Sequence, residues 1–250
     1  MKIKFKGEVM ISNIDEVVKI IKESNNIVFF GGAGVSTESG IPDFRSVDGL
    51  YNQKYKYPPE TILSHTFFMN NVDEFYRFYK DKCLEPMLKA EPNAVHLALA
   101  KLEKDGKLKA IVTQNIDDLH HRAGNRNIYE LHGTSFKNHC MECGKSYTIE
   151  DILKADGVPH CSCGGIIKPD VVLYEEGLDQ NTIAKSIEAI SKADVLIISG
   201  TTLVVQPAAS FINYYQGNKM ILINLSEVPN EDRIDYVLHC KAGEVFSKFI

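Results

Sequence analysis

Short apolar runs alternate with amphipathic segments along most of this chain. Five runs rich in β-branched and aromatic residues predict short buried strands, at residues 27–30, 110–113, 128–131, 195–199 and 220–223. The segments around them predict helices, at residues 13–24, 92–103, 180–192 and 207–216, with several more within 60–90. Strands that alternate with helices favour an α/β fold, a mainly parallel sheet with helices on both faces.

Glycine or polar residues stand just beyond the carboxyl end of each predicted strand. They are Gly32, Gln114, Asn115, Asp117, His132, Thr201 and Asn224. The carboxyl ends of parallel strands share one edge of a sheet, and ligands bind at that edge. Five strands that end in this way indicate one composite nucleotide site. His96, inside a predicted helix, is interpreted instead as a packed or capping residue.

The first predicted strand runs into a glycine-rich turn, with Gly31, Gly32 and Gly34, and then into the run Pro-Asp-Phe-Arg that ends at Arg45. Such a turn can bring backbone N–H groups close to a phosphate, and the guanidinium could pair with a diphosphate. The spacing GGAG is not the dinucleotide fingerprint GxGxxG. On its own, the turn is also compatible with an ordinary strand-to-helix connection.

Four of the six cysteines form two close pairs, Cys140 with Cys143 and Cys161 with Cys163, separated by 17 residues. This spacing predicts a tetrahedral zinc site with four thiolates and no open position for catalysis. The metal is therefore expected to stabilise a small module at about 135–170, which is too small to have its own core. A redox pair is disfavoured by the second cysteine pair, and an iron–sulfur cluster is a weaker alternative. The other two cysteines, Cys83 and Cys240, are interpreted as packing residues.

The composition is that of an ordinary soluble globular protein, with 250 residues, 44% hydrophobic and 24% charged. A net charge of −5 argues against a general nucleic-acid binder. The first ten residues have no apolar core of signal-peptide length, and no run approaches the length of a membrane span. A cytoplasmic location is expected. In that compartment the cysteines of the protein are expected to be free thiols or metal ligands and not disulfides.

The chain closely resembles the sirtuins, the NAD-dependent protein deacylases, over about residues 13–246. The motifs that carry the resemblance are GAGVS (32–36), GIPDFR (40–45), QNID (114–117), HG (132–133), the four cysteines, PDVVLYEE (169–176), SGTTLVVQPA (199–208), LIN (222–224) and KAGEVF (241–246). The resemblance implies a single catalytic core with a Rossmann-like part at about 1–45, 91–134 and 171–250. A helical module at about 46–90 and the zinc module at 135–170 would form a smaller domain, with NAD and an acylated lysine meeting in the cleft.

The resemblance also implies roles for residues. Those expected to bind NAD are Gly32, Ala33, Gly34, Thr37, Asp43, Phe44, Arg45, Gln114, Asn115, Ile116, Asp117, His132, Gly200, Thr201, Thr202, Asn224 and Ala242. His132 would be the general base, and Asn115 would be the second catalytic residue, which orients the ribose. The peptide substrate would lie against Val171, Val172, Leu173 and Tyr174.

The leading interpretation is an NAD-dependent protein-lysine deacetylase. It would release nicotinamide and transfer the acetyl group of an acetyl-lysine protein or peptide to ADP-ribose. Mono-ADP-ribosyl transfer to a protein and a non-catalytic NAD-sensing module are the alternatives. A zinc-ribbon nucleic-acid binder is disfavoured by the acidic balance. A polar loop at 46–59 is expected to close only over bound NAD.

The sequence departs from the sirtuin pattern at three places. Asp118 replaces the glycine that usually follows QNID, a change in a surface turn that we expect to be tolerated. Glu175 replaces the glycine of the FGE motif, which leaves the peptide preference open. Tyr79 stands where relatives that remove succinyl or malonyl groups carry an arginine, so uncharged acyl groups are expected to be preferred.

Overall fold

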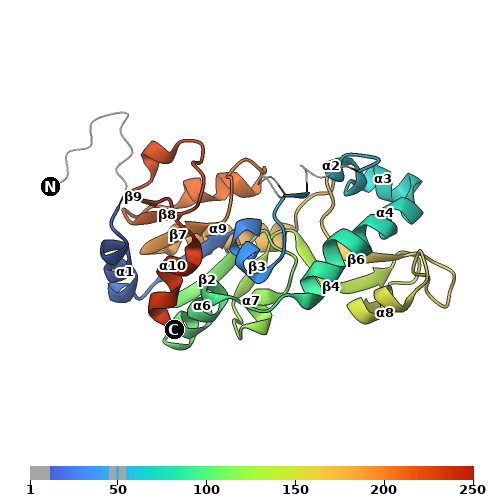
Figure 1. Cartoon of the computed structure of the whole chain (residues 1–250), viewed down its shortest axis with the longest axis horizontal. Helices are drawn as coiled ribbons and strands as arrows, with labels where there is room; N and C mark the ends of the chain where they lie inside the picture. The colour runs from blue at the N-terminus through green and yellow to red at the C-terminus, as the bar shows by residue number, and fades with distance from the viewer. Residues whose placement is uncertain (1–11, 45–48, 51–54) are drawn as a thin grey trace.

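A six-stranded parallel sheet forms the larger part of the molecule (Figure 1). The computed structural model describes residues 12–44, 49–50 and 55–250, and its strands follow the order β3-β2-β1-β7-β8-β9. They are β1 (Ile27–Gly31), β2 (Leu108–Thr113), β3 (Ile128–Glu130), β7 (Val195–Ser199), β8 (Met220–Ile223) and β9 (Tyr236–Leu238). All neighbouring pairs are parallel. This is the doubly wound order, in which the topology reverses beside β1 and a ligand binds at the reversal. Of these six strands, only β9 was not predicted.

Helices cover both faces of this sheet, which confirms the predicted fold class. Because side chains alternate along a strand, Ile27 and Phe29 of β1 pack into one core cluster and Val28 and Phe30 into another. The first face carries α1 (Ile14–Glu23), α6 (Ala94–Lys104), α10 (Ala242–Phe246) and η7 (Ser247–Phe249). The second carries α9 (Gln180–Lys192) and the 3₁₀ helix η5 (Ala208–Tyr214). Burial on both faces explains why the strands are continuous apolar runs.

A smaller unit lies at the other end of the molecule, on the right of Figure 1. Its strands form an antiparallel sheet in the order β5-β4-β6. They are β4 (Gly133–Cys140), β5 (Ser146–Thr148) and β6 (Ile167–Val171). Its helices are α2 (Pro59–Ile62), α3 (His65–Asn70), α4 (Val72–Phe78), the π-helical turn η4 (Tyr79–Leu84), α5 (Glu85–Lys89) and α8 (Ile149–Lys154).

The helical module and the four-cysteine module of this smaller unit share one hydrophobic core. Phe75 and Tyr76 of α4 pack in the same cluster as Ile152 of α8 and Ile167 of β6. The Tyr76 hydroxyl donates to the backbone carbonyl of Ile167. The cysteine module was expected to be too small to have a core of its own, and in the structure it shares the core of the helical module. Its apolar side chains are also buried against helices that precede it by about 70 residues in the chain.

None of the helices in the described part of the chain is long and apolar enough to cross a lipid bilayer.

Two buried histidines lie side by side between α6 and the short helix α7 (Leu119–Arg122), with ring centroids 4.7 Å apart. His96 is a capping residue, as predicted, because its Nδ1 accepts from the backbone N–H of Asn93 at the start of α6. His120 packs its ring edge-on against Phe29. Burial lowers the pKa of both side chains, that of His96 to about 4. Both are therefore neutral in the folded protein at neutral pH.

We expect the free energy of unfolding to decrease as the pH falls below 6.5. The unfolded chain takes up a proton on each histidine near pH 6.5, whereas folded His96 does so only near its pKa of about 4. For this residue alone the loss between those two values is about 3 kcal/mol. Urea unfolding between pH 4 and 8 measures it. His96→Gln should have a shallower slope, whereas exposed His160→Gln should match the wild type. Equal slopes in all three proteins would contradict the prediction.

Candidate active site

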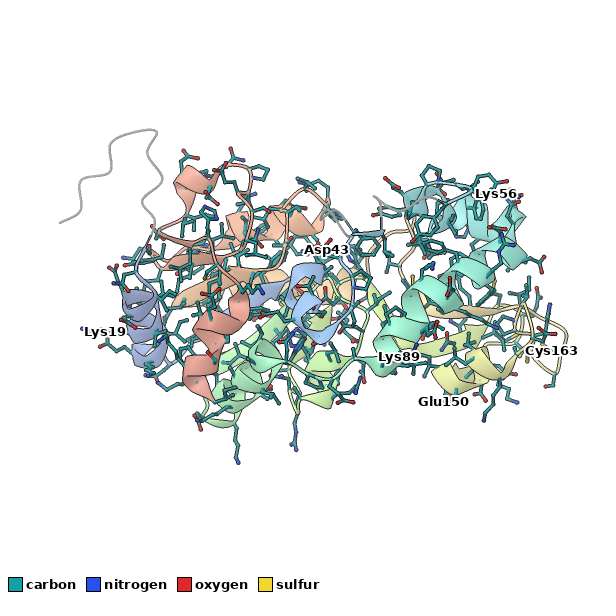
Figure 2. The ribbon with its side chains drawn as sticks, viewed as in Figure 1. Lys19, Asp43, Lys56, Lys89, Glu150 and Cys163 are labelled. Atoms are coloured by element: carbon teal, nitrogen blue, oxygen red, sulfur yellow. The ribbon has the colours of Figure 1, made fainter. Side chains whose placement is uncertain are left out.

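A cavity of about 750 Å³ opens where the parallel sheet meets the smaller unit, along the carboxyl ends of β1, β2, β7 and β8. Asp43 marks this junction in Figure 2. All the described residues predicted to hold NAD line this one cavity: Gly32, Ala33, Gly34, Thr37, Asp43, Phe44, Gln114, Asn115, Ile116, Asp117, His132, Gly200, Thr201, Thr202, Asn224 and Ala242. Arg45 and much of the predicted 46–59 lid, at 45–48 and 51–54, lie outside the described residues.

Two glycine turns cross beneath the cavity. Gly34 donates its N–H to the carbonyl of Gly200 at 2.8 Å, and Gly32 donates to the carbonyl of Ser199 at 3.1 Å. A Cβ on Gly34 would lie 2.8 Å from the Cα of Gly200, so glycine is required for this approach. Gly200 also adopts a left-handed φ of 62°. The turn was expected to present its N–H groups to a phosphate, but these two amides are already bonded to the β7 turn.

A buried hydrogen-bond network joins the first glycine turn to the segment after β2. Ser36 donates its hydroxyl to the Asp117 carboxylate at 2.6 Å and accepts from the Asn115 amide at 3.1 Å. The other Asp117 oxygen accepts from the backbone N–H of Leu119. Burial raises the pKa of Asp117, and the bonds from Ser36 and Leu119 offset part of this effect. The sequence reasoning placed Ser36 only in the GAGVS motif and missed its structural part in the site.

His132 follows β3 and reaches the same cavity. Its Nδ1 lies 2.9 Å from the backbone carbonyl of Gln114. Since a carbonyl can only accept, Nδ1 carries the proton, and neutral Nε2 has a free lone pair. Burial lowers the pKa of His132 below its ordinary value of 6.5, partly offset by the bond to Gln114. The side chain can therefore accept a proton at neutral pH.

The predicted peptide strand lies beside this histidine. Val172 donates its N–H to the carbonyl of His132 at 2.9 Å, and Tyr174 pairs with the helical module through Leu63 and His65. Val171, Val172, Leu173 and Tyr174 all line the cavity.

The first two departures from the sirtuin pattern both fall on left-handed backbone. Asp118 has a φ of 63°, and Glu175 has a φ of 76°. These are positions that glycine favours, and aspartate adopts this region more readily than other residues with side chains do. Asp118 precedes α7 as its N-cap and is partly buried. The Glu175 carboxylate accepts from the backbone N–H of Thr66 at 2.9 Å, a contact that ties the peptide strand to α3.

The four predicted zinc ligands converge at the end of the molecule farthest from the parallel sheet, where Figure 2 labels Cys163. Their sulfur atoms lie within 4.8 Å of one another, with Cys140–Cys163 at 3.5 Å and Cys143–Cys161 at 3.6 Å. Zinc–sulfur bonds of about 2.3 Å in a tetrahedron place the sulfur atoms about 3.8 Å apart, so this donor set fits zinc. The glycines after each pair, Gly144 and Gly164, adopt left-handed φ angles that suit the knuckle turns.

Side chains from the helical module complete the cavity wall. Tyr79, Cys83 and Met87 line it on successive turns. The resemblance had singled out Tyr79, but no local sequence signal separated Cys83 and Met87 from the other core residues of this segment. Cys83 and Cys240, interpreted as packing residues, both line the cavity. Burial raises the pKa of the Cys83 thiol to about 12, so this cysteine is not a nucleophile near neutral pH.

The sequence profile of the Sir2 family matches residues 32–207. This chain belongs to the Sir2 family. A relative from Clostridium acetobutylicum, named NAD-dependent protein deacetylase, is 55% identical over 96% of this chain and 99% of its own length. One of the same name from Clostridium perfringens is also 55% identical, over 96% and 100%. We therefore identify the chain as an NAD-dependent protein deacetylase of the Sir2 family.

Solved sirtuin structures share this fold. A histidine-to-alanine Sir2 variant in complex with a deacetylated p53 peptide and 3′-O-acetyl-ADP-ribose superposes with a TM-score of 0.87. It is 38% identical over 95% of this chain and 97% of the other. A Sir2–p53 peptide–NAD⁺ complex superposes with a TM-score of 0.83 at the same identity and coverage.

Proposed function

We propose that this chain removes the acetyl group from lysine side chains of proteins, with His132 as the general base and NAD as the acceptor. The observation that carries the assignment is the tautomer of His132. The Nδ1 contact with the Gln114 carbonyl leaves Nε2 unprotonated, on a side chain that lines the cavity shared by the predicted NAD and peptide residues. In the family mechanism, NAD supplies a ribose carbon whose bond to nicotinamide breaks as the acetyl-amide oxygen attacks. Nε2 of His132 would then take the proton of a ribose hydroxyl.

The other lining residues would hold the two substrates in the geometry for attack. Asn115 and Asp117, fixed by Ser36, would orient the nicotinamide and its ribose. Gln114 donates to the Thr201 hydroxyl at 3.1 Å, which would join the ribose end to the adenosine end of the site. The predicted peptide strand would bind the backbone of the substrate by strand addition.

Zinc would act structurally in this proposal. Four thiolates would fill its coordination sphere and leave no position for water or substrate. The cysteines would hold the end of β6, the strand that leads directly into the peptide-binding residues.

Several sequence predictions stay part of this proposal. The Rossmann-like part would comprise about 1–45, 91–134 and 171–250, with the helical and zinc modules between. The protein would act in the cytoplasm, where its six unpaired cysteines would stay reduced, and would bind no nucleic acid directly.

Mass spectrometry of an acetyl-lysine peptide, incubated with the protein with and without NAD, tests the proposal. We expect deacetylation that requires NAD and yields nicotinamide and O-acetyl-ADP-ribose in equal amounts. ADP-ribose retained on protein would indicate the transferase alternative. NAD binding without turnover of any acyl peptide would indicate the sensor.

We expect acetyl-lysine peptides to react at least about tenfold faster than succinyl-lysine peptides, measured as kcat/KM, because an unpaired buried carboxylate is unfavourable. Tyr79, at the position of the acid-recognising arginine, is buried and donates its hydroxyl to Ser135 at 2.9 Å. Lys82 also lines the cavity, but its ammonium pairs with Asp81 at 2.9 Å. Equal rates for the two peptides would contradict the prediction. Lys82→Met is the control, and it should leave the preference for acetyl-lysine unchanged.

A further inference from the structure

A buried carboxylate lies in the connection between β8 and β9, two strands whose following segments both line the cavity. Glu231, in the 3₁₀ helix η6 (Glu231–Arg233), is 7% exposed. Its Oε2 lies 3.3 Å from Nε2 of His239, and its Oε1 has no hydrogen-bond partner among the described residues. A buried carboxylate is unfavourable unless it is paired, so His239 is the group that makes this position tolerable.

The ring of His239 contacts groups on two different segments. Nδ1 of His239 lies 3.3 Å from the backbone carbonyl of Asn224, which can only accept, so Nδ1 carries a proton. Nε2 of the same ring faces the Glu231 carboxylate at 3.3 Å. The ring therefore donates a hydrogen bond to the Asn224 carbonyl through Nδ1 and contacts the buried carboxylate through Nε2.

The two segments that His239 connects, one after β8 and one after β9, both line the cavity. Asn224, Leu225 and Ser226 line it after β8, and residues 240–242 line it after β9. The N–H of Asn224 donates to the carbonyl of Leu238 at 3.0 Å, so the backbone of Asn224 is bonded on both sides to the segment that carries His239. Neither Glu231 nor His239 is among the lining residues, so neither would touch the ligand.

We propose that Glu231 and His239 are positioning residues that hold the two walls of the adenosine end of the NAD site. The proposal rests on the proposed function only in that this end of the cavity receives the adenosine half of NAD. A rigid wall binds with less ordering cost than a mobile one. The pair acts on a part of NAD distant from the bond that breaks, so its loss should weaken binding of NAD more than it slows the chemical step.

Steady-state kinetics of deacetylation, with NAD varied at saturating peptide, measures this effect. We expect Glu231→Leu and His239→Phe to raise the KM for NAD about tenfold, the scale of one lost hydrogen bond to a charged group. The kcat and the KM for the peptide should stay within about twofold of the wild type. Because Glu231→Leu alters a buried position, His239→Phe, at a partly exposed one, provides the second test.

Two further variants separate this role from a purely structural one. Glu231→Gln should retain the wild-type KM for NAD, because its amide can donate to Nε2 of neutral His239. Glu188→Leu is the matched control, since it removes an exposed carboxylate paired with Lys192 on α9. It should change neither constant.

Titration calorimetry of NAD with each folded variant gives a readout that does not need turnover. Weaker NAD binding by Glu231→Leu and His239→Phe supports the positioning role. This holds even if the wild type turns over no acetyl peptide, because absent turnover contradicts only the proposed deacetylase function. Unchanged NAD binding in both variants overturns the proposal. So does a Glu231→Gln variant that binds NAD as weakly as Glu231→Leu.

Discussion

Replacement of His132 by alanine is expected to lower kcat for deacetylation by about 10²–10⁴, the usual contribution of a positioned general base. The ring is fixed by the bond from its Nδ1 to the Gln114 carbonyl, so Nε2 is the only nitrogen that can accept a proton. Alanine removes this acceptor but leaves the crossed glycine turns and the Ser36 network in place. The KM for NAD should therefore change much less than kcat.

The pH profile of the wild type provides an independent check of this role. Burial lowers the pKa of His132 below 6.5, and the neutral form is the active one. The rate should be constant near neutral pH and fall only on the acid side of 6.5. Exposed His121, which lies outside the cavity lining, offers a matched control. Wild-type kinetics in His121→Ala are expected. A His132→Ala variant with the wild-type kcat would contradict the role of His132 as general base.

Loss of zinc is expected to abolish deacetylation while the parallel sheet remains folded. Structural zinc contributes about 10–16 kcal/mol to small metal modules, more than the whole stability of most domains. The four thiolates would hold together the turn after β4 and the turn before β6, and β6 leads directly into the peptide strand. Without the metal this strand loses its support on one side. The helices that share the core should keep only part of the module in place.

Metal analysis of the purified protein should give one zinc per chain, and Cys161→Ser should give much less. For that variant we expect lost peptide turnover with NAD binding retained, because the NAD residues belong mainly to the parallel sheet and its turns. Ser162→Ala, between two ligands, should behave as the wild type in both assays. Full peptide turnover by a zinc-free protein would contradict the structural role.

Local signals in the sequence were enough to predict the sheet, the site edge and the metal ligands. Strands buried on both faces have to be continuous apolar runs, and a parallel sheet has to place their carboxyl ends along one edge. The residues after those ends, from Gln114 to Asn224, could therefore be assigned to one cavity before any contact was known. The metal ligands could also be assigned from the sequence, because two close cysteine pairs at this separation are typical of a four-thiolate zinc site. His96 was interpreted as a packed or capping residue because it lies inside a predicted helix beside Leu97 and Leu99, and it is both.

Other features of the site depend on contacts between segments far apart in the chain, and only the tertiary structure shows them. Sequence spacing indicated that Gly32 and Gly34 form a turn, but not that the β7 turn would take up their N–H groups. The resemblance implied that the helical and cysteine modules form one smaller domain, but only the structure showed which side chains make up their shared core. The protonated nitrogen of His132 is set by a carbonyl 18 positions earlier, and the Glu231–His239 pair is visible only when β8 and β9 are adjacent. Such properties arise from burial and hydrogen bonding across the fold, and a pattern of residue types along the chain does not specify them.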